Sequence, residues 1–316
     1  MAGIELCEPR DLYNILNQHW LLPRLAETNY LCLLDVRTQR EYDESHILTA
    51  RRIAQSPAGK YLVPDSEELA CVRYCVLYDD ETSSLDRCDS DEERGSRFSD
   101  SSPTSSQQAK KGAAIHYAKG LEQFTSHPVL ILQGGYKKFS ACYHFLRTQR
   151  TLWMPWELAN LQTYPVEILP AKLYMGNFKQ ACNQQIQKDL KIKAQVNISE
   201  QSATSFADSD RYLHVSVPDT LEADLFSSFP TICHFIDAQL DHGAVLVFSS
   251  LGISRSSTGI MAYLIHSCMF SLKSAWSHVL KCKTNMRPHQ GFVKQLLDWE
   301  TKLYKTTVTD ISELQC

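Results

Sequence analysis

Residues 245–259, VLVFSSLGISRSSTG, restrict the possible folds of this chain more than any other stretch. The stretch begins as an apolar strand, passes through a glycine, small hydroxyl residues and one arginine, and continues into an apolar helix. Such a turn gathers backbone N–H groups, the positive end of a helix dipole and Arg255 around one point. It predicts a strand–loop–helix unit of an α/β domain, with a site for an oxyanion at the loop.

Short apolar strands alternate with helical segments along the chain, which predicts α/β domains with mostly parallel sheets. In the first half we expect strands at 30–36, 71–78 and 127–136, and helices at 113–124 and 138–147. In the second half we expect strands at 171–177, 193–199, 211–217 and 243–249, and helices at 224–240, 257–269, 273–283 and 291–304.

A chain of 316 residues suits two domains of ordinary size. The stretch 80–112 is rich in Ser, Asp and Glu and has almost no large apolar side chains, so we expect a disordered insertion there. Pro155 and Pro165 break the periodicity between the two halves, which favours a linker. The expected divisions are a first domain at 1–150, a linker at 151–165, a second domain at 166–305 and a tail at 306–316.

The overall charge limits the classes of partner. A net charge of −4 gives no reason to expect nucleic acid or an anionic membrane as the main partner. The eleven cysteines include no C-x-x-C pair, which fits reduced thiols and no metal site, and no cofactor motif is present. The first twenty residues resemble neither a signal peptide nor a transit peptide, so a cytoplasmic location is expected, with an organellar pool left open.

The second domain resembles the dual-specificity protein phosphatases, whose signature is H-C-x5-R-S at a strand–loop–helix junction. The matching stretches are the loop itself, LYMGN, VNIS, VPDT and MRPHQGFVKQLLDWE, and they occur in the family's order. The resemblance implies a phosphate-binding loop. Its residues here are Ser249, Gly252, Ile253, Ser254, Arg255 and Ser256.

This chain departs from that signature at the positions that carry out catalysis in the family. Phe248 and Ser249 stand where the family has histidine and cysteine, and Leu251 replaces a small residue. A loop cysteine works because nearby dipoles and arginine lower its pKa to ~3.5–7.5, whereas a serine hydroxyl in the same field stays protonated and needs a general base. We therefore expect no catalytic residue in this loop. Two alternatives for anion binding stay equally open: the loop still binds phosphate, or it is an inert turn whose anion affinity is lost behind Phe248 and Leu251.

Asp219 occupies the position of the family's general acid, within VPDT. Without a nucleophile there is no leaving group for it to protonate. We therefore expect a vestigial acid that acts as a turn or cap residue.

The first domain resembles the rhodanese-like domains, which are three-layer α/β/α folds, through LCLLDVRTQREYDESHI and VLILQGGYKKFSACY. An active rhodanese needs a cysteine after the strand at 71–78, where this chain has Asp79 and Asp80. Cys71 and Cys75 are expected inside that strand as core thiols. The resemblance therefore implies the fold without the activity.

The order of the two domains resembles that of mitogen-activated-protein-kinase phosphatases, in which a basic cluster of the first domain docks the kinase. The comparable stretch here has only Arg51, Arg52 and Lys60, of which Arg51 and Arg52 are the candidate docking residues. The architecture and the loop also resemble the serine/threonine/tyrosine-interacting-like pseudophosphatases. This resemblance implies an inactive regulator that binds phosphoproteins, active phosphatases or kinases. A pure scaffold with an inert loop and a weak residual phosphatase are the alternatives.

Overall fold

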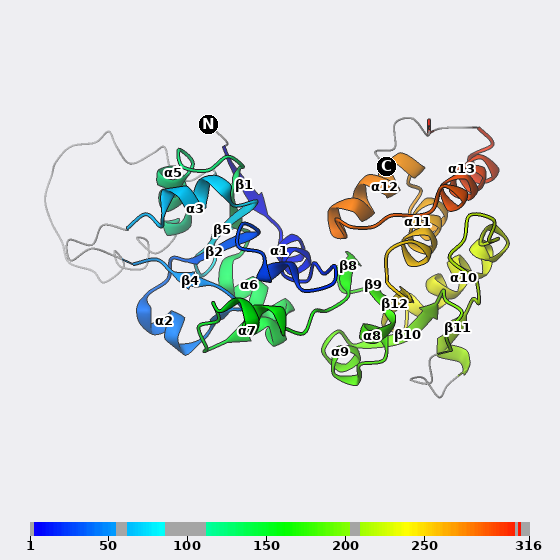
Figure 1. The fold of residues 1–316 in the computed structure, drawn as a ribbon, viewed down its shortest axis with the longest axis horizontal. Coiled ribbons are helices and arrows are strands. Elements are labelled where there is room, and N and C mark those ends of the chain that lie inside the picture. Colours follow the sequence, from blue (N-terminus) through cyan, green and yellow to red (C-terminus); the bar gives the residue numbers. More distant parts are fainter. Residues whose placement is uncertain (1–2, 55–61, 86–111, 203–208, 307–308, 311–316) are drawn as a thin grey trace, which may run out of the picture. The chain divides into compact units, whose positions relative to one another are not determined.

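The computed structural model describes residues 3–54, 62–85, 112–202, 209–306 and 309–310 (Figure 1). The chain divides into two compact units. The first unit consists of residues 1–16 and 21–161, and the second of residues 17–20 and 162–316. Most of the expected insertion and nearly all of the expected tail lie outside the described residues.

A five-stranded parallel sheet forms the centre of the first unit. The strand order is β1 (Ile4–Cys7), β6 (Val129–Leu132), β5 (Tyr74–Tyr78), β2 (Leu31–Asp35) and β4 (Arg51–Arg52). The three central strands, β2, β5 and β6, are short and almost fully buried, which fits a sheet covered on both faces. A separate antiparallel pair consists of β3 (His46–Ile47) and β7 (Arg147–Thr148).

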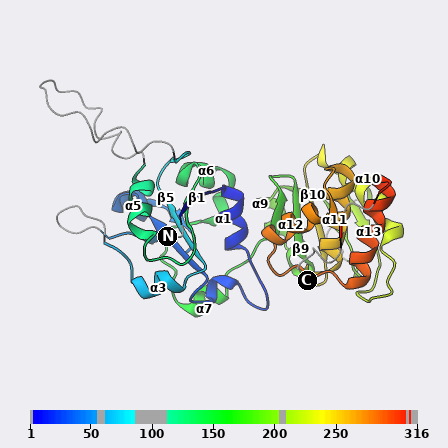
Figure 2. The same ribbon diagram turned by 90° about the horizontal axis from the view of Figure 1, so that it is seen from above.

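Helices cover both faces of this sheet (Figure 2). On one face, α3 (Ser66–Cys71) and α5 (Ala113–Leu121) pack on alternate residues of β2, β5 and β6. On the other face lie α1 (Pro9–Leu16) and α6 (Gly135–Cys142). The remaining helices are α2 (Gln39–Glu44), η1 (Arg24–Ala26), η2 (His144–Leu146) and α7 (Pro155–Ala159).

The second unit has a five-stranded sheet in which only one strand is antiparallel. The order is β11 (Tyr212–His214), β10 (Ile192–Asn197), β12 (Ala244–Ser249), β9 (Leu173–Asn177) and β8 (Val166–Leu169), with β8 antiparallel to β9. All six residues of β12, the central strand, are buried. The sequence expectation of alternating strands and helices is confirmed.

Four helices build the larger core of this second unit. They are α10 (Phe229–Leu240), α11 (Arg255–Ser267), α12 (Leu272–Cys282) and α13 (Gln290–Tyr304). The short helices α8 (Phe178–Ala181) and α9 (Gln184–Asp189) lie on the other face, and η3 (Ser209–Arg211) and η4 (Phe226–Ser228) are single 3₁₀ turns. The two-domain α/β fold class expected from the sequence is confirmed.

One local expectation was wrong. Cys71 lies at the exposed end of α3 and not in a strand, because β5 begins only at Tyr74, whereas Cys75 is buried in β5 as expected. Pro155 begins α7, since proline at the first helical position loses no hydrogen bond, and the two units divide after Leu161, within the expected linker. No helix in the described part of the chain is long and apolar enough to cross a membrane.

Candidate phosphate-binding loop

The loop between β12 and α11 is held in a tight turn by Gly252. Its φ is +70°, and a Cβ atom there would lie 2.5 Å from the carbonyl oxygen of Gly176 on β9. The Ile253 carbonyl accepts the backbone N–H of Arg287 at 3.1 Å, which fixes the loop from its other side. The predicted loop residues 249–256 are therefore brought together between the carboxyl end of β12 and the amino end of α11.

Ser249 is 2% exposed and lies at the floor of this loop. Its hydroxyl donates to Ser256 Oγ at 3.1 Å and accepts the N–H of Gly252 at 3.2 Å. Among the described residues, no carboxylate, imidazole or amine forms a hydrogen bond with Ser249 Oγ. A hydroxyl placed in this way has no base to remove its proton.

Arg255 is 5% exposed and is held by three oxygen atoms. One terminal nitrogen donates to the Val217 carbonyl at 2.7 Å and the other to Ser250 Oγ at 3.1 Å. Its Nε lies 3.5 Å from Asp219 Oδ2. A guanidinium carries five N–H donors, so each terminal nitrogen has one further N–H, and Nε forms no hydrogen bond within the described part of the chain.

Asp219 connects the loop to two other segments. Its Oδ1 accepts the Ser254 hydroxyl at 2.8 Å and lies 3.3 Å from Nε2 of His289, while Oδ2 pairs with Arg255. The sequence favoured a role within its own turn, but these contacts are to residues far away in the chain. His289, which precedes α13, was not predicted as a site residue, because only its contact with Asp219 identifies it.

The sequence left open that Phe248 and Leu251 hide the loop from an anion. Successive side chains of a strand point to opposite faces, so Phe248 points away from Ser249. Its fully buried ring packs edge-on against Phe178 of α8, with 6.0 Å between ring centres. Leu251 is 71% exposed.

The corresponding loop of the first unit is filled by its own aspartate. The buried Asp79 carboxylate accepts the N–H groups of Glu81, Thr82 and Ala114 at 2.8–3.3 Å, and the Thr82 hydroxyl at 2.5 Å. Backbone N–H groups that could hold an anionic sulfur species are therefore already bonded. Asp79 therefore uses this loop's N–H groups at the position where the sequence resemblance places the rhodanese cysteine.

Arg51 and Arg52, the predicted kinase-docking residues, lie on the short edge strand β4. Arg51 forms an ion pair with Glu68 of α3 and donates to Cys32 Sγ at 3.3 Å. Its charge is therefore neutralised within the first unit. Among the described residues, no group of three or more His, Cys, Asp or Glu side chains is placed to hold a metal ion.

Comparison with known families gives the class of each unit. Residues 173–302 match the dual specificity phosphatase catalytic domain, and residues 17–142 match the rhodanese-like domain. The chain thus combines a rhodanese-like domain with a phosphatase-like domain of the dual-specificity type.

Several dual specificity phosphatases are similar to this chain. The chain is 30% identical to a probable rhodanese domain-containing dual specificity protein phosphatase of Dictyostelium discoideum, over 55% of this chain and 37% of the relative. It is 34% identical to dual specificity protein phosphatase Mpk3 of Drosophila melanogaster, over 46% and 36%. The chain thus spans little more than a third of these two relatives, but 83% of mouse dual specificity protein phosphatase 1, at 29% identity over 92% of this chain.

Solved structures also match part of this chain. Human DUSP28 is 28% identical with a TM-score of 0.43, and the match covers 46% of this chain and 97% of that one. The human tyrosine phosphatase-like serine/threonine/tyrosine-interacting protein is 27% identical with a TM-score of 0.40, over 44% and 97%.

Proposed function

We propose that this chain is a pseudophosphatase, a regulator that binds phosphorylated protein segments at residues 249–256 without hydrolysing them. The observation that carries the proposal is the environment of Ser249. Its hydroxyl is bonded to Ser256 and to the N–H of Gly252, and it has no base. An anion can be held by such a loop, but the attack that would begin hydrolysis has no nucleophile.

Binding draws on parts of the loop that do not need a nucleophile. The first N–H groups of α11 have no partner within the helix, and the helix dipole adds positive potential there. Arg255 contributes two free donors, each charge-assisted bond being worth roughly 1.5–3 kcal/mol. The Asp219 carboxylate opposes an incoming phosphate, so we expect weak, phosphate-dependent binding.

Partners of this kind would place the chain in phosphorylation signalling. The relatives of this chain are named as dual specificity phosphatases, so phosphoproteins, active phosphatases and kinases are the partners we propose. Bound phosphoproteins would be shielded from active phosphatases. Neutralisation of Arg51 by Glu68 makes the first unit's basic pair a poor docking surface.

The test compares binding with turnover in the full-length protein. Fluorescence anisotropy measures the affinity for a phosphotyrosine peptide and for its unphosphorylated form, and p-nitrophenyl phosphate measures hydrolysis. Arg255→Gln should lower the phosphopeptide affinity at least tenfold, whereas Lys294→Gln, which removes an exposed charge of α13, should not change it. Thermal unfolding checks that each variant is folded.

Two results would reject this function. Hydrolysis by the wild type that disappears in Arg255→Gln would identify a residual phosphatase. Equal affinity for the two peptides, or no binding of either, would identify a scaffold whose loop is inert. Phosphate-dependent binding with no turnover is the expected result.

A further inference from the structure

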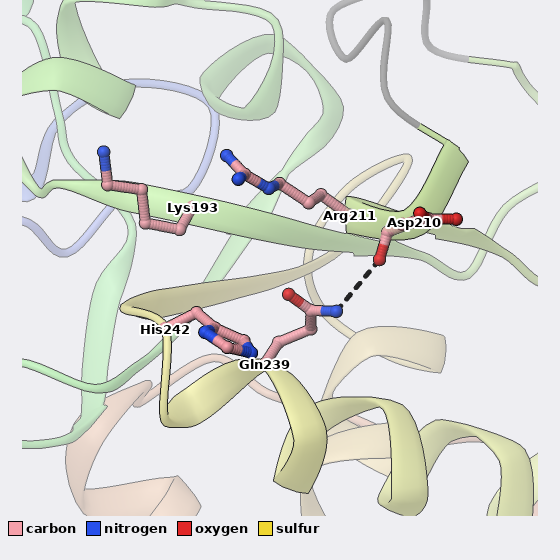
Figure 3. Close-up of a pocket in the computed structure, with 5 residues that line it drawn as sticks. All are labelled: Lys193, Asp210, Arg211, Gln239 and His242. Carbon is pink, nitrogen blue, oxygen red and sulfur yellow. Dashed lines mark hydrogen bonds between the residues drawn. The ribbon is translucent and has the colours of Figure 1, made fainter.

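A polar pocket of about 460 Å³ lies in the second unit, away from the loop (Figure 3). It is lined by Lys193 of β10, Asp210 and Arg211 of η3, Gln239 of α10 and His242. Three of these five residues carry basic side chains. Nothing in the proposed function uses them.

The pocket has an excess of positive charge. Within the described part of the chain, neither Lys193 nor Arg211 forms an ion pair, and both side chains are exposed. Figure 3 shows the Arg211 guanidinium extending toward Lys193, while the Asp210 carboxylate points away from both. The Asp210 carbonyl accepts the Gln239 side-chain amide at 2.9 Å, which ties η3 to α10 beside the pocket.

Gly243 permits this position of Lys193. Gly243 has a φ of +152°, and a Cβ atom there would lie 2.3 Å from Cγ of Lys193. The aliphatic part of the lysine therefore lies directly against the turn after α10. A residue with a side chain at 243 would force the Lys193 side chain to move.

A second pocket of about 510 Å³ continues the positive surface. It shares Lys193 and adds Lys188 and Lys191, the residues at the end of α9 and before β10. Lys193 thus has basic residues on both sides, with Arg211 and His242 in one pocket and Lys188 and Lys191 in the other. This surface is larger than a single anionic group would fill. Clusters of this kind attract multiply charged oxyanions over a Debye length of about 8–10 Å.

The positive pocket lies at the opposite end of the sheet from the candidate phosphate-binding loop. Asn197 pairs with Phe248 at the carboxyl end of β10, and Lys193 lies four residues earlier on that strand. This separation is roughly 13 Å along the strand. One phosphate group cannot contact both places, so the two sites act independently.

We propose that Lys193, Arg211 and His242 form a second binding site for a phosphate-class oxyanion carried by a phosphorylated protein segment. Lys193 and Arg211 supply fixed charges, Arg211 can bind two phosphate oxygens at once, and His242 adds a donor. The adjoining Lys188 and Lys191 accommodate acidic residues that flank the phosphate. This site gives the chain a second contact with a partner that carries more than one phosphate.

Isothermal titration calorimetry on the full-length protein tests this site. The probes are pyrophosphate, a phosphoserine peptide with flanking acidic residues, and its unphosphorylated form. When Arg255→Gln has removed the loop's own binding, the double change Lys193→Gln/Arg211→Gln should lower the affinity for the phosphorylated peptide at least tenfold. The control Lys172→Gln/Lys294→Gln removes the same charge from exposed positions of this unit and should bind as the wild type does.

The number of pyrophosphate molecules bound per protein distinguishes the two sites. With both sites active, the wild type binds two equivalents of pyrophosphate, and Arg255→Gln and the Lys193/Arg211 double variant each bind one. If the loop does not bind, the wild type binds one equivalent and Arg255→Gln changes nothing, which leaves the second site intact. Binding of pyrophosphate without the phosphopeptide would assign free phosphate as the ligand source at this same site.

Three results would overturn the second site. One is an unchanged affinity for the phosphorylated peptide when Lys193→Gln/Arg211→Gln is added to Arg255→Gln, once thermal unfolding has shown that the variant is folded. Another is equal binding of the unphosphorylated acidic peptide, which would show a preference for carboxylates. The third is binding only to vesicles that contain phosphoinositides, which would assign the surface to a membrane.

Discussion

Asp219 Oδ2 lies 3.5 Å from Arg255 Nε and joins the loop before η4 to the first turn of α11. The carboxylate occupies the side of the guanidinium that would otherwise strengthen the binding of an anion. The candidate phosphate-binding loop therefore contains its own competing anion. Because the Asp219 side chain is 32% exposed, water and salt weaken this competition.

Replacing Asp219 by asparagine should increase the affinity for a phosphotyrosine peptide. The change removes a negative charge beside Arg255 and keeps the side chain's size. Because the Asp219 carboxylate is partly exposed, its repulsion of a bound phosphate is worth up to about 1 kcal/mol, so we expect a gain of about fivefold, measured by fluorescence anisotropy. Asp298→Asn, on the exposed face of α13, is the control of equal charge. A loss of affinity in Asp219→Asn would mean that the carboxylate supports the loop instead of opposing the ligand.

The double change Phe248→His/Ser249→Cys should give measurable hydrolysis of p-nitrophenyl phosphate. A thiol at 249 would receive the N–H of Gly252 and lie beside Ser256 and the amino end of α11, which lowers its pKa. Adding Arg255→Gln to the double variant should remove the activity. An inactive but folded double variant would show that the loop geometry does not support catalysis.

The histidine of that double variant carries a stability cost. The Phe248 ring is fully buried against Phe178, and a polar ring there loses apolar contacts and water. Relative to Ser249→Cys alone, we expect the double variant to lose about 1–3 kcal/mol of unfolding free energy in urea. Equal midpoints for the two variants would contradict this packing.

Gly252→Ala should destabilise the second unit. Its φ of +70° is unfavourable for alanine, and the new Cβ would lie 2.5 Å from the Gly176 carbonyl oxygen. We expect a loss of about 1–3 kcal/mol, measured by urea unfolding. The neighbouring Leu251→Ala changes an exposed side chain of the same loop and should cost less than about 0.5 kcal/mol. Similar effects of the two changes would show that the turn is not tight.

Lys283 makes stability depend on pH above neutrality. Burial lowers the pKa of its amine from 10.5 to about 8. Below pH 8 the amine is charged in both the folded and the unfolded state, so the folded state is destabilised by the full cost of burying the charge. Between pH 8 and 10.5 the folded state binds fewer protons than the unfolded state. The unfolding free energy should therefore rise across that window, by an amount of the order of 3 kcal/mol.

The variant Lys283→Met identifies the group responsible. We expect it to be more stable than the wild type at pH 7 and to lose most of the rise between pH 8 and 10.5, as measured by urea unfolding at a series of pH values. Lys294→Met, an exposed lysine of α13, should keep that rise. A wild-type profile that stays flat above pH 8 would mean that Lys283 is hydrated.

Much of the fold could be predicted from local pattern. The apolar runs predicted the central strands of both units, because strands covered on both faces need apolar residues at every position. The elements that escaped were short edge strands, such as β1, where two of four residues are exposed, and short helices, such as α1, α8 and α9. The pattern could not place Cys71 or α7, since helix and strand compete closely in short segments.

The sequence by itself determined that a strand, a glycine turn and a helix meet at residues 245–259, because periodicity and glycine act over neighbouring residues. Only the tertiary structure decided what surrounds that turn. Asp219, Arg255 and His289 are far apart in the chain, as are Lys193, Arg211 and His242. Charges interact through space, so their balance at either site follows from how β10, α10, α11 and α13 pack, which no local pattern contains.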